Sequence, residues 1–125
     1  QFKTEKQCLV VSGAWYDPYT SKNFKKAKKI DIDHVVPLKE AHISGASGWT
    51  KEKKQQFAND EDNLLAVSRS ANRSKGAKDP AKWMPENEAF HCEYIKKWVA
   101  IKEKYILYMD RKEQQKVNRV LEGCI

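Results

Sequence analysis

The chain has 125 residues, the size of one compact domain, so residues 1–125 are interpreted as a single domain with one core. It carries 24 Lys and Arg against 17 Asp and Glu, and the formal net charge of +7 favours a polyanionic partner. No apolar run reaches the roughly 18 residues of a membrane-spanning helix, so no membrane partner is expected. Composition therefore argues against a membrane-spanning protein and points toward nucleic acid.

The first half of the chain predicts two strands and two helices. Residues 9–12 are apolar and β-rich, and residues 13–21 are typical of a turn-rich connection. Apolar and polar residues alternate over residues 30–36, which predicts a strand with His34 near its end. Helices are expected at residues 38–44 and 50–59, the second capped by Thr50.

The second half of the chain predicts one strand and three helices. A strand over residues 64–67 is followed by a helix that Ser68 or Ser70 caps and Gly76 ends. The strongest helical periodicity runs from residue 87 or 88 to residue 105. Asp110 and Glu113 resemble a capping box for a last helix. The predicted fold class is α+β, with a two-stranded antiparallel element, a crossing helix and additional packing helices.

Three cysteines, Cys8, Cys92 and Cys124, lack the C-x-x-C spacing of a zinc site. They leave open one bridge with a free thiol, three buried thiols, or a partner cysteine outside the chain. We favour a Cys92–Cys124 bridge, because these residues flank two predicted helices that an antiparallel arrangement would bring together. Such a bridge indicates an oxidising compartment, and Gln1 in place of Met indicates processing or excision, so a secreted or periplasmic location is expected.

A carboxylate, an imidazole and two carboxamides follow one another in order: Asp33, His34, Asn63 and Asn72. Phosphodiester hydrolysis needs a base for water and a cation that neutralises the charge on the phosphate. An imidazole can accept a proton near neutral pH, so His34 is the candidate base. Asp33 and the carboxamide oxygen of Asn72 form an all-oxygen ligand pair that suits Mg²⁺. Asn63 both donates and accepts, so it is expected to tie down the loop that carries His34.

Other residues receive weaker interpretations. Basic side chains surround the second half of this site and are expected to contact phosphates: Arg69, Arg73 and Lys75. Tyr16 and Tyr19 lie in the turn-rich segment and are freer to contact substrate, whereas the tryptophans are expected in the core. Glu40 is interpreted as a solvated helix residue, with a place near the site as the alternative. His42 and His91 are not expected to be catalytic.

The ordered motif resembles the HNH, or ββα-metal, nucleases, and in particular their secreted and restriction-associated branch. The resemblance covers roughly residues 8 to 124, and its motifs are Asp31-x-Asp33-His34-x-x-Pro37-Leu38, Asp62-Asn63-Leu64-Leu65 and Asn72-Arg73-x-Lys75-Gly76. By that likeness His34 is the general base, Asp33 and Asn72 hold the metal, and Asn63 fixes the loop. Asn72 replaces a common His, which favours Mg²⁺ or Mn²⁺ over zinc.

The resemblance implies a single HNH endonuclease domain, a hydrolase of phosphodiester bonds. We expect it to act as a monomer on DNA, with RNA left open as a substrate and with little sequence specificity. Contacts to the phosphate backbone carry no sequence information. A toxin role would add an acidic immunity protein as partner. The alternative is a noncatalytic basic nucleic-acid-binding module, in which Asp33, His34 and Asn72 are structural. A second alternative is an interaction domain whose charge only gives solubility.

Overall fold

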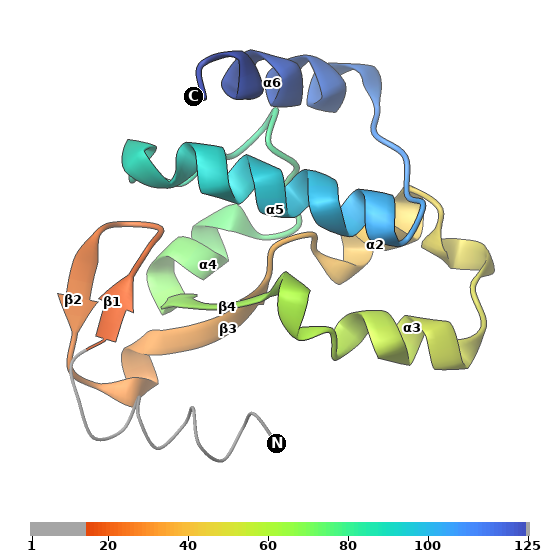
Figure 1. Cartoon of the computed structure of the whole chain (residues 1–125). Coiled ribbons are helices and arrows are strands. Elements are labelled where there is room, and N and C mark those ends of the chain that lie inside the picture. Colours follow the sequence, from red (N-terminus) through yellow and green to blue (C-terminus); the bar gives the residue numbers. More distant parts are fainter. Residues whose placement is uncertain (1–14, 125) are drawn as a thin grey trace.

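The structure is a computed structural model that describes residues 15–124 (Figure 1). In this range the chain is α+β, as predicted, with two small antiparallel sheets and five α-helices. The strands are β1 (Trp15–Asp17), β2 (Lys22–Phe24), β3 (Ile30–His34) and β4 (Leu64–Ser68). The helices are α2 (Leu38–Ile43), α3 (Lys51–Ala58), α4 (Arg69–Lys75), α5 (His91–Lys104) and α6 (Arg111–Glu122). Cys8 and the strand expected over residues 9–12 lie outside the described residues.

Strands β3 and β4 and helix α4 form one continuous unit. β3 and β4 pair antiparallel along their whole length, with Ile30 opposite Ser68. The Ser68 side chain accepts a hydrogen bond from the Ala71 amide at 3.1 Å, which starts α4 directly after the strand. α4 ends at Gly76, whose φ of 55° lies in the left-handed region that favours glycine. The two strands and the helix that follows them are therefore those expected from the sequence.

A hairpin precedes β3, where the sequence predicted only a turn-rich connection over residues 13–21. Strands β1 and β2 pair antiparallel with Trp15 opposite Phe24. Buried Asp17 closes the turn, because its carboxylate accepts a hydrogen bond from the Tyr19 amide at 3.1 Å. Each strand has only three residues, too few to give a recognisable alternation.

The turn of this hairpin directs Tyr19 into the protein. Tyr19 is 0% exposed, and its ring centroid lies 5.2 Å from that of Trp83 and 5.6 Å from that of Tyr94. The prediction that Tyr19 is free to contact substrate is therefore wrong. Tyr16, on β1, is 55% exposed.

Helix α5 is central to the core, and α6 lies over it on the side away from the sheets (Figure 1). Its inward residues Tyr94, Ile95 and Trp98 are fully buried. α6 begins with the predicted capping box, in which Asp110 accepts from the Glu113 amide at 2.8 Å and the Glu113 side chain accepts from the Asp110 amide. None of the described helices is long and apolar enough to cross a bilayer.

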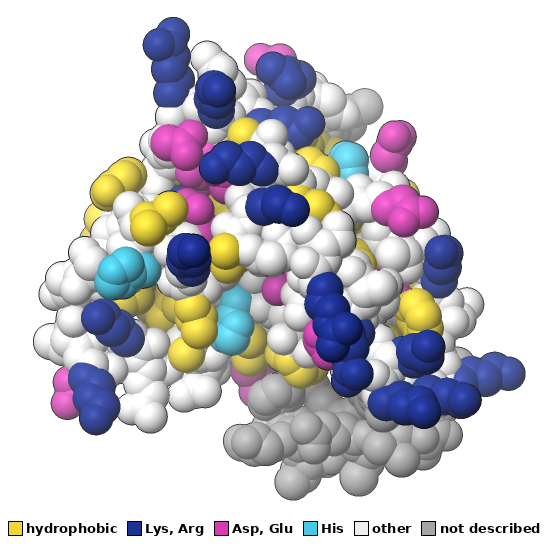
Figure 2. Space-filling model, turned by 180° about the vertical axis from the view of Figure 1, so that it is seen from behind, with side chains coloured by type: hydrophobic (Ala, Val, Ile, Leu, Met, Phe, Trp, Pro, Cys, Tyr) yellow, Lys and Arg dark blue, Asp and Glu magenta, His cyan; other side chains and the backbone are white. Residues whose placement is uncertain are grey.

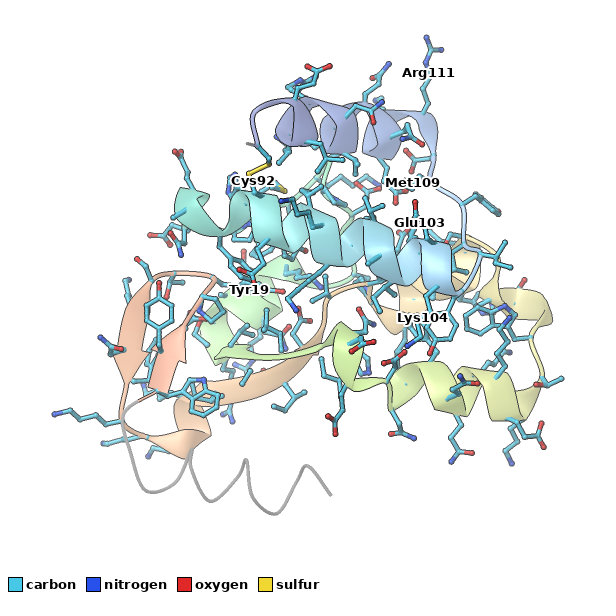
Figure 3. The ribbon with its side chains drawn as sticks, in the orientation of Figure 1. Tyr19, Cys92, Glu103, Lys104, Met109 and Arg111 are labelled. Atoms are coloured by element: carbon cyan, nitrogen blue, oxygen red, sulfur yellow. A yellow bond between two sulfur atoms is a disulfide. The ribbon has the colours of Figure 1, made fainter. Side chains whose placement is uncertain are left out.

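A disulfide joins α5 to the residue that follows α6. Cys92 and Cys124 are bonded, with their Cα atoms 5.8 Å apart, as the sequence predicted (Figure 3). The bond spans a sequence separation of 32 residues, so it fixes the C-terminal helix on the core.

Glu40 on α2 differs from its prediction as a solvated residue. It is 5% exposed, and its carboxylate accepts from the Lys102 ammonium at 2.8 Å. Lys102 also pairs with Glu113 at 2.7 Å, and the Trp98 indole donates to Glu113 at 2.9 Å. The alternation of polar and apolar residues in α2 did not show that a buried cation lay opposite Glu40.

Candidate active site

The candidate site lies where α4 packs against β3. Alternation along a strand places the side chains of Asp31 and Asp33 on one face of β3. Asn72 and Lys75 are one helical turn apart on α4 and face these carboxylates. The Asn72 amide nitrogen donates to Asp31 at 3.2 Å, and the Lys75 ammonium lies 3.1 Å from Asp33. Strand and helix thus bring two carboxylates, a carboxamide and an ammonium together.

Asp33 is held inside the protein. Asp33 is 6% exposed. Its carboxylate accepts a 2.6 Å hydrogen bond from the Tyr19 hydroxyl and also forms the ion pair with Lys75. Burial raises the pKa of Asp33, and the neighbouring Lys75 charge opposes that rise. Burial likewise lowers the pKa of Lys75, opposed by Asp33. The Asp33 charge is therefore balanced from within the fold.

Asp31 is the site residue that our sequence analysis did not select. It is bonded to Asn72, the expected metal ligand, whereas Asp33 is paired with Lys75. The Asp31 side chain is 28% exposed and also accepts from Arg69 Nε at 3.1 Å. The Asp-x-Asp spacing carried the signal, because residues two apart on a strand share a face.

His34 is the last residue of β3, and its ring is fixed by one hydrogen bond. Its Nε2 lies 2.8 Å from the carbonyl oxygen of Ala58, at the end of α3. A carbonyl only accepts, so Nε2 carries the proton in the neutral ring and Nδ1 keeps its lone pair. The ring is half-buried, so it keeps access to solvent. A fixed ring with an unprotonated nitrogen is the arrangement that a general base requires.

Asn63 fixes the chain immediately after His34. It is fully buried, its carboxamide oxygen accepts from the Val36 amide at 2.8 Å, and its nitrogen donates to the Val36 carbonyl at 3.0 Å. The Asn63 carbonyl also accepts from the Val35 amide at 2.8 Å. These are side-chain to backbone bonds of the kind expected from the sequence, and they hold the loop that follows β3.

The three basic residues expected at phosphates occupy different environments. The Arg69 side chain is 42% exposed and Arg73 is exposed, so both can reach a ligand in solution. Lys75 is 0% exposed and donates to the His34 carbonyl at 2.9 Å as well as to Asp33. Lys75 is therefore not available to a phosphate in this structure. It lies on the same face of α4 as Asn72, and from there it connects α4 to β3.

The other two described histidines lie outside the hydrogen-bonded groups of the candidate site. His91 Nε2 lies 2.6 Å from the carbonyl of Pro85, a residue that precedes α5, and His42 is exposed on α2.

Lys and Arg side chains gather at the lower right of the face shown in Figure 2, at the end of the molecule that carries the β1–β2 hairpin. The surface beside the β1–β2 hairpin is therefore strongly basic.

Comparison with known proteins places the chain in a nuclease-related class. Residues 1–120 match the family model described as "GmrSD restriction endonucleases, C-terminal domain", and the chain belongs to this family. A protein of Arthroderma benhamiae named "Uncharacterized secreted protein" is 38% identical over 119 residues. The match covers 94% of this chain and 58% of the relative, so the chain spans just over half of the relative's length. No solved structure gave a significant match.

Proposed function

We propose that this chain is a metal-dependent endonuclease of the HNH type that hydrolyses phosphodiester bonds of DNA with little sequence specificity, with RNA as the second substrate to test. The observation that carries the proposal is the fixed His34 ring, with Nε2 bonded to the Ala58 carbonyl, at the end of a strand that also presents Asp31 and Asp33 to α4. Membership of a restriction-endonuclease family supports it.

His34 acts as the general base in this mechanism. Its Nδ1 takes the proton of a water molecule, and the oxygen of that water attacks the phosphorus in line with the departing 3′ oxygen. The hydrogen bond to Ala58 stabilises the ring when it becomes positively charged, because a carbonyl accepts from Nε2 in either charge state. Asn63 keeps the loop after His34 in place, which is an orienting role.

The oxygen donors at the site fit a hard divalent cation, Mg²⁺ or Mn²⁺. The residues that would hold it are Asp33 and Asn72, although Asp33 would have to give up its pair with the Lys75 ammonium to do so. Asp31, bonded to Asn72 and with a side chain that is 28% exposed, is a further donor. When bound, the cation neutralises charge on the phosphate and stabilises the leaving oxygen. Lys75 keeps α4 on β3 and so keeps these donors on one face.

The substrate is held mainly through its backbone. Arg69 at the start of α4 has a partly exposed side chain, and Arg73 in its last turn is exposed, so we propose that both contact phosphates beside the site. Contacts of this kind position a nucleic acid without reading its sequence. Low specificity follows from this arrangement.

The proposed location is extracytoplasmic, and the proposed state is a monomer. The disulfide between Cys92 and Cys124 fits an oxidising compartment, and the relative from Arthroderma benhamiae is named a secreted protein. If the activity serves as a toxin, the basic surface is a fitting target for an acidic inhibitor protein.

The experiment is a cleavage assay on supercoiled plasmid and on RNA, each with Mg²⁺, with Mn²⁺ and with EDTA. We expect cleavage that needs metal and falls about 100-fold or more in His34→Ala, because general base catalysis contributes about 10² to 10⁴. His42→Ala is the matched control, since His42 is an exposed histidine on α2, and it should cleave like the unaltered chain. Nucleic-acid binding without cleavage under either metal would instead establish the noncatalytic module.

Two substitutions distinguish the roles of Asp31 and Asp33 in metal binding. Asp33→Asn and Asp31→Asn each remove one charge with little change of shape, and we expect both to raise the metal concentration needed for half-maximal cleavage. Unfolding curves of both variants are needed, because Asp33 is buried against Lys75 and Asp31 is not buried. An unchanged metal requirement in Asp33→Asn, with a raised one in Asp31→Asn, would assign the metal to Asp31 in place of Asp33.

A further inference from the structure

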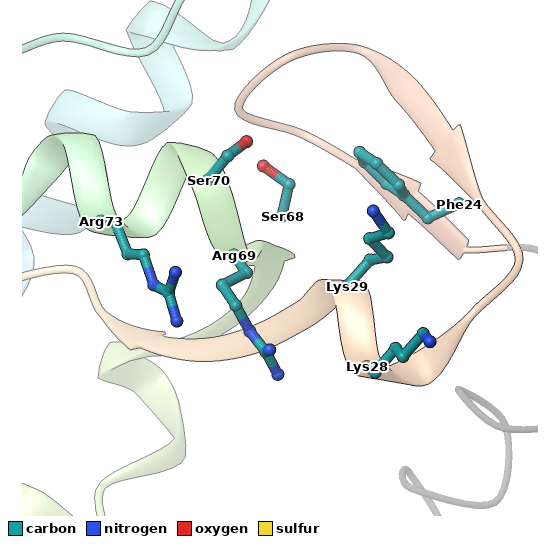
Figure 4. Close-up of a pocket in the computed structure, with 7 residues that line it drawn as sticks. All are labelled: Phe24, Lys28, Lys29, Ser68, Arg69, Ser70 and Arg73. Atoms are coloured by element: carbon teal, nitrogen blue, oxygen red, sulfur yellow. The ribbon is translucent and has the colours of Figure 1, made fainter.

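A concave pocket lies between the β1–β2 hairpin and the start of α4, next to the candidate active site. Its volume is about 570 Å³, and Figure 4 shows its lining: Phe24, Lys28, Lys29, Ser68, Arg69, Ser70 and Arg73. Lys28 and Lys29 come from the turn before β3, while Arg69 and Arg73 come from α4. Segments that are far apart in the sequence thus form one pocket.

The pocket is strongly positive. Four cationic side chains line it, and Lys28, Lys29 and Arg73 are exposed. Among the residues that the structure describes, the Asp31 carboxylate contacts this group, because it accepts from Arg69. A concave surface with an excess of one sign of charge concentrates ligands of the opposite sign, so the favoured ligand is a polyanion.

Phe24 gives the pocket a second property. Its ring is partly exposed and forms one wall, and Lys29 points toward it in Figure 4. An aromatic ring beside cations matches single-stranded nucleic acid, whose bases stack on aromatic rings while the phosphates meet Lys and Arg. The bases of a duplex already stack on one another, so the ring favours an unpaired base. The volume lies within the roughly 300 to 1,000 Å³ of small-ligand sites, large enough for a nucleotide.

The pocket is connected to the active site through Arg69. This side chain lines the pocket and donates to Asp31, which in turn accepts from Asn72. β3 begins beside the pocket and ends at His34, and its five residues span about 13 Å at roughly 3.3 Å per step. A nucleic-acid strand that follows β3 therefore reaches both places within a few nucleotides.

We propose that this pocket binds unpaired nucleotides of the substrate a few positions from the bond that is cleaved. Phe24 stacks on a base, and Lys28, Lys29 and Arg73 contact the phosphates on either side of it. The link to cleavage rests on the proposed function; the binding of single strands does not. Phe24 of the hairpin, with Lys28 and Lys29 of the turn before β3, is thereby part of the substrate site.

The test is the affinity of the whole chain for a dye-labelled single strand and for the matched duplex, measured in EDTA over a series of salt concentrations. Lys28→Gln with Lys29→Gln should weaken single-strand binding and lower the slope of log affinity against log salt by about 1.4, because each lost phosphate contact contributes about 0.7. Arg111→Gln with Lys112→Gln removes the same charge from α6, whose Arg111 points away from the core in Figure 3, and should leave the slope unchanged.

A Phe24→Leu variant tests the stacking. It should weaken single-strand binding about tenfold without changing the salt slope, and it should leave duplex binding unchanged, because stacking adds roughly 1 to 3 kcal/mol per base and carries no charge. Circular dichroism of each variant checks that the hairpin still folds.

Each outcome decides the proposal. Equal loss of single-strand and duplex affinity in the lysine variant would assign the pocket to duplex backbone and overturn it. Unchanged single-strand affinity in both variants, or no binding by the unaltered chain, would also overturn it. Binding in EDTA is measured apart from cleavage, so a chain that binds single strands through this pocket but cleaves nothing would contradict the proposed function alone.

Discussion

Lys75 and Lys102 are both buried, at 0% and 1% exposure, but their surroundings differ. The Lys102 ammonium has three close acceptors at 2.7 to 2.8 Å, namely the carboxylates of Glu40 and Glu113 and the carbonyl of Tyr108. Lys75 pairs with one carboxylate, Asp33, at 3.1 Å and with the His34 carbonyl at 2.9 Å. One lysine is enclosed by helices, and the other lies beside the candidate active site.

The difference shows how the same residue type supports two purposes. Two hydrogen bonds of Lys102, to Glu40 and to the Tyr108 carbonyl, and its ion pair with Glu113 fix α2, α5 and α6 to one another. Lys75 lies one helical turn from Asn72, and both Asn72 and its partner Asp31 are partly exposed, so a ligand can enter there. The enclosed Lys102 cluster contributes to stability, whereas the Lys75 cluster beside the site holds functional groups in position. Substitutions of Lys102 and of Lys75 separate these two contributions.

The largest effect is expected for Lys102→Met. It leaves two carboxylates, Glu40 and Glu113, buried without their cation, and breaking a buried pair in this way costs about 3 to 5 kcal/mol. Urea unfolding measures the loss, and Lys112→Met on the exposed face of α6 is the control. Cleavage per folded molecule should stay unchanged. A loss below about 1 kcal/mol would show that the cluster does not hold the helices.

Removal of the disulfide tests the same helices by another route. Cys92→Ala with Cys124→Ala opens a loop with a sequence separation of 32, for which loop entropy predicts a loss of about 3 to 4 kcal/mol. Thermal unfolding of the double variant and of the unaltered chain, each with and without reductant, measures the stability that the disulfide contributes. If reductant destabilises the double variant as much as the unaltered chain, the stabilisation does not come from this bond.

Lys75→Met is expected to cost less stability and more activity. Asp33 is the one carboxylate that loses its cation, and it keeps the hydrogen bond from the Tyr19 hydroxyl, so a loss of about 2 to 3 kcal/mol is expected. Cleavage per folded molecule should fall, because α4 is no longer tied to the His34 carbonyl. Undiminished cleavage at full folding would remove Lys75 from the positioning of the site. The double variant Lys75→Met with Asp33→Asn should recover part of the stability.

A third cluster, at the edge of α5, gives the smallest effect. Burial first, and then the 2.6 Å hydrogen bond to Asp60, raises the pKa of Tyr105 to about 12 from an ordinary value near 10. The raised pKa means that its stabilisation is complete below about pH 10 and is lost as the pH rises to about 12. We expect the neutral Tyr105 side chain to contribute about 1 to 2 kcal/mol to the free energy of unfolding, after allowing for solvent screening.

The measurement is the pH dependence of unfolding for the unaltered chain and for Tyr105→Phe. The variant should lose part of the slope between about pH 10 and pH 12, with the rest due to Tyr19 and Tyr94, whose pKa values burial also raises. Identical slopes would mean that the Asp60 hydrogen bond does not stabilise the fold.

The sequence predicted the elements whose signals are local. The Asp110 capping box, the Ser68 cap and the strand before His34 each depend on neighbours in the chain, and all three appear in the structure. The alternation in that strand did not predict its buried side, because Ile32 is 40% exposed and Asp33 is buried. The pairing of Cys92 with Cys124 followed from helices that were themselves predicted correctly.

Long-range partners were not predictable in the same way. Periodicity alone does not show that Lys75 turns inward to Asp33, 42 residues earlier in the chain, or that Glu40 meets Lys102 across 62 residues. The inward position of Tyr19 depends on a hairpin with strands of three residues. These positions are set by tertiary packing, which overrides local preference.

The central claim is that the His34 imidazole is the base, and the most direct measurement is chemical rescue. Plasmid cleavage by His34→Gly is measured in Mg²⁺ with increasing concentrations of free imidazole, with His42→Gly as the control. Our account predicts that His34→Gly alone is at least about 100-fold slower and that its rate rises with imidazole concentration, while His42→Gly does not respond. Full activity of His34→Gly without imidazole, or no response at any concentration, would contradict it.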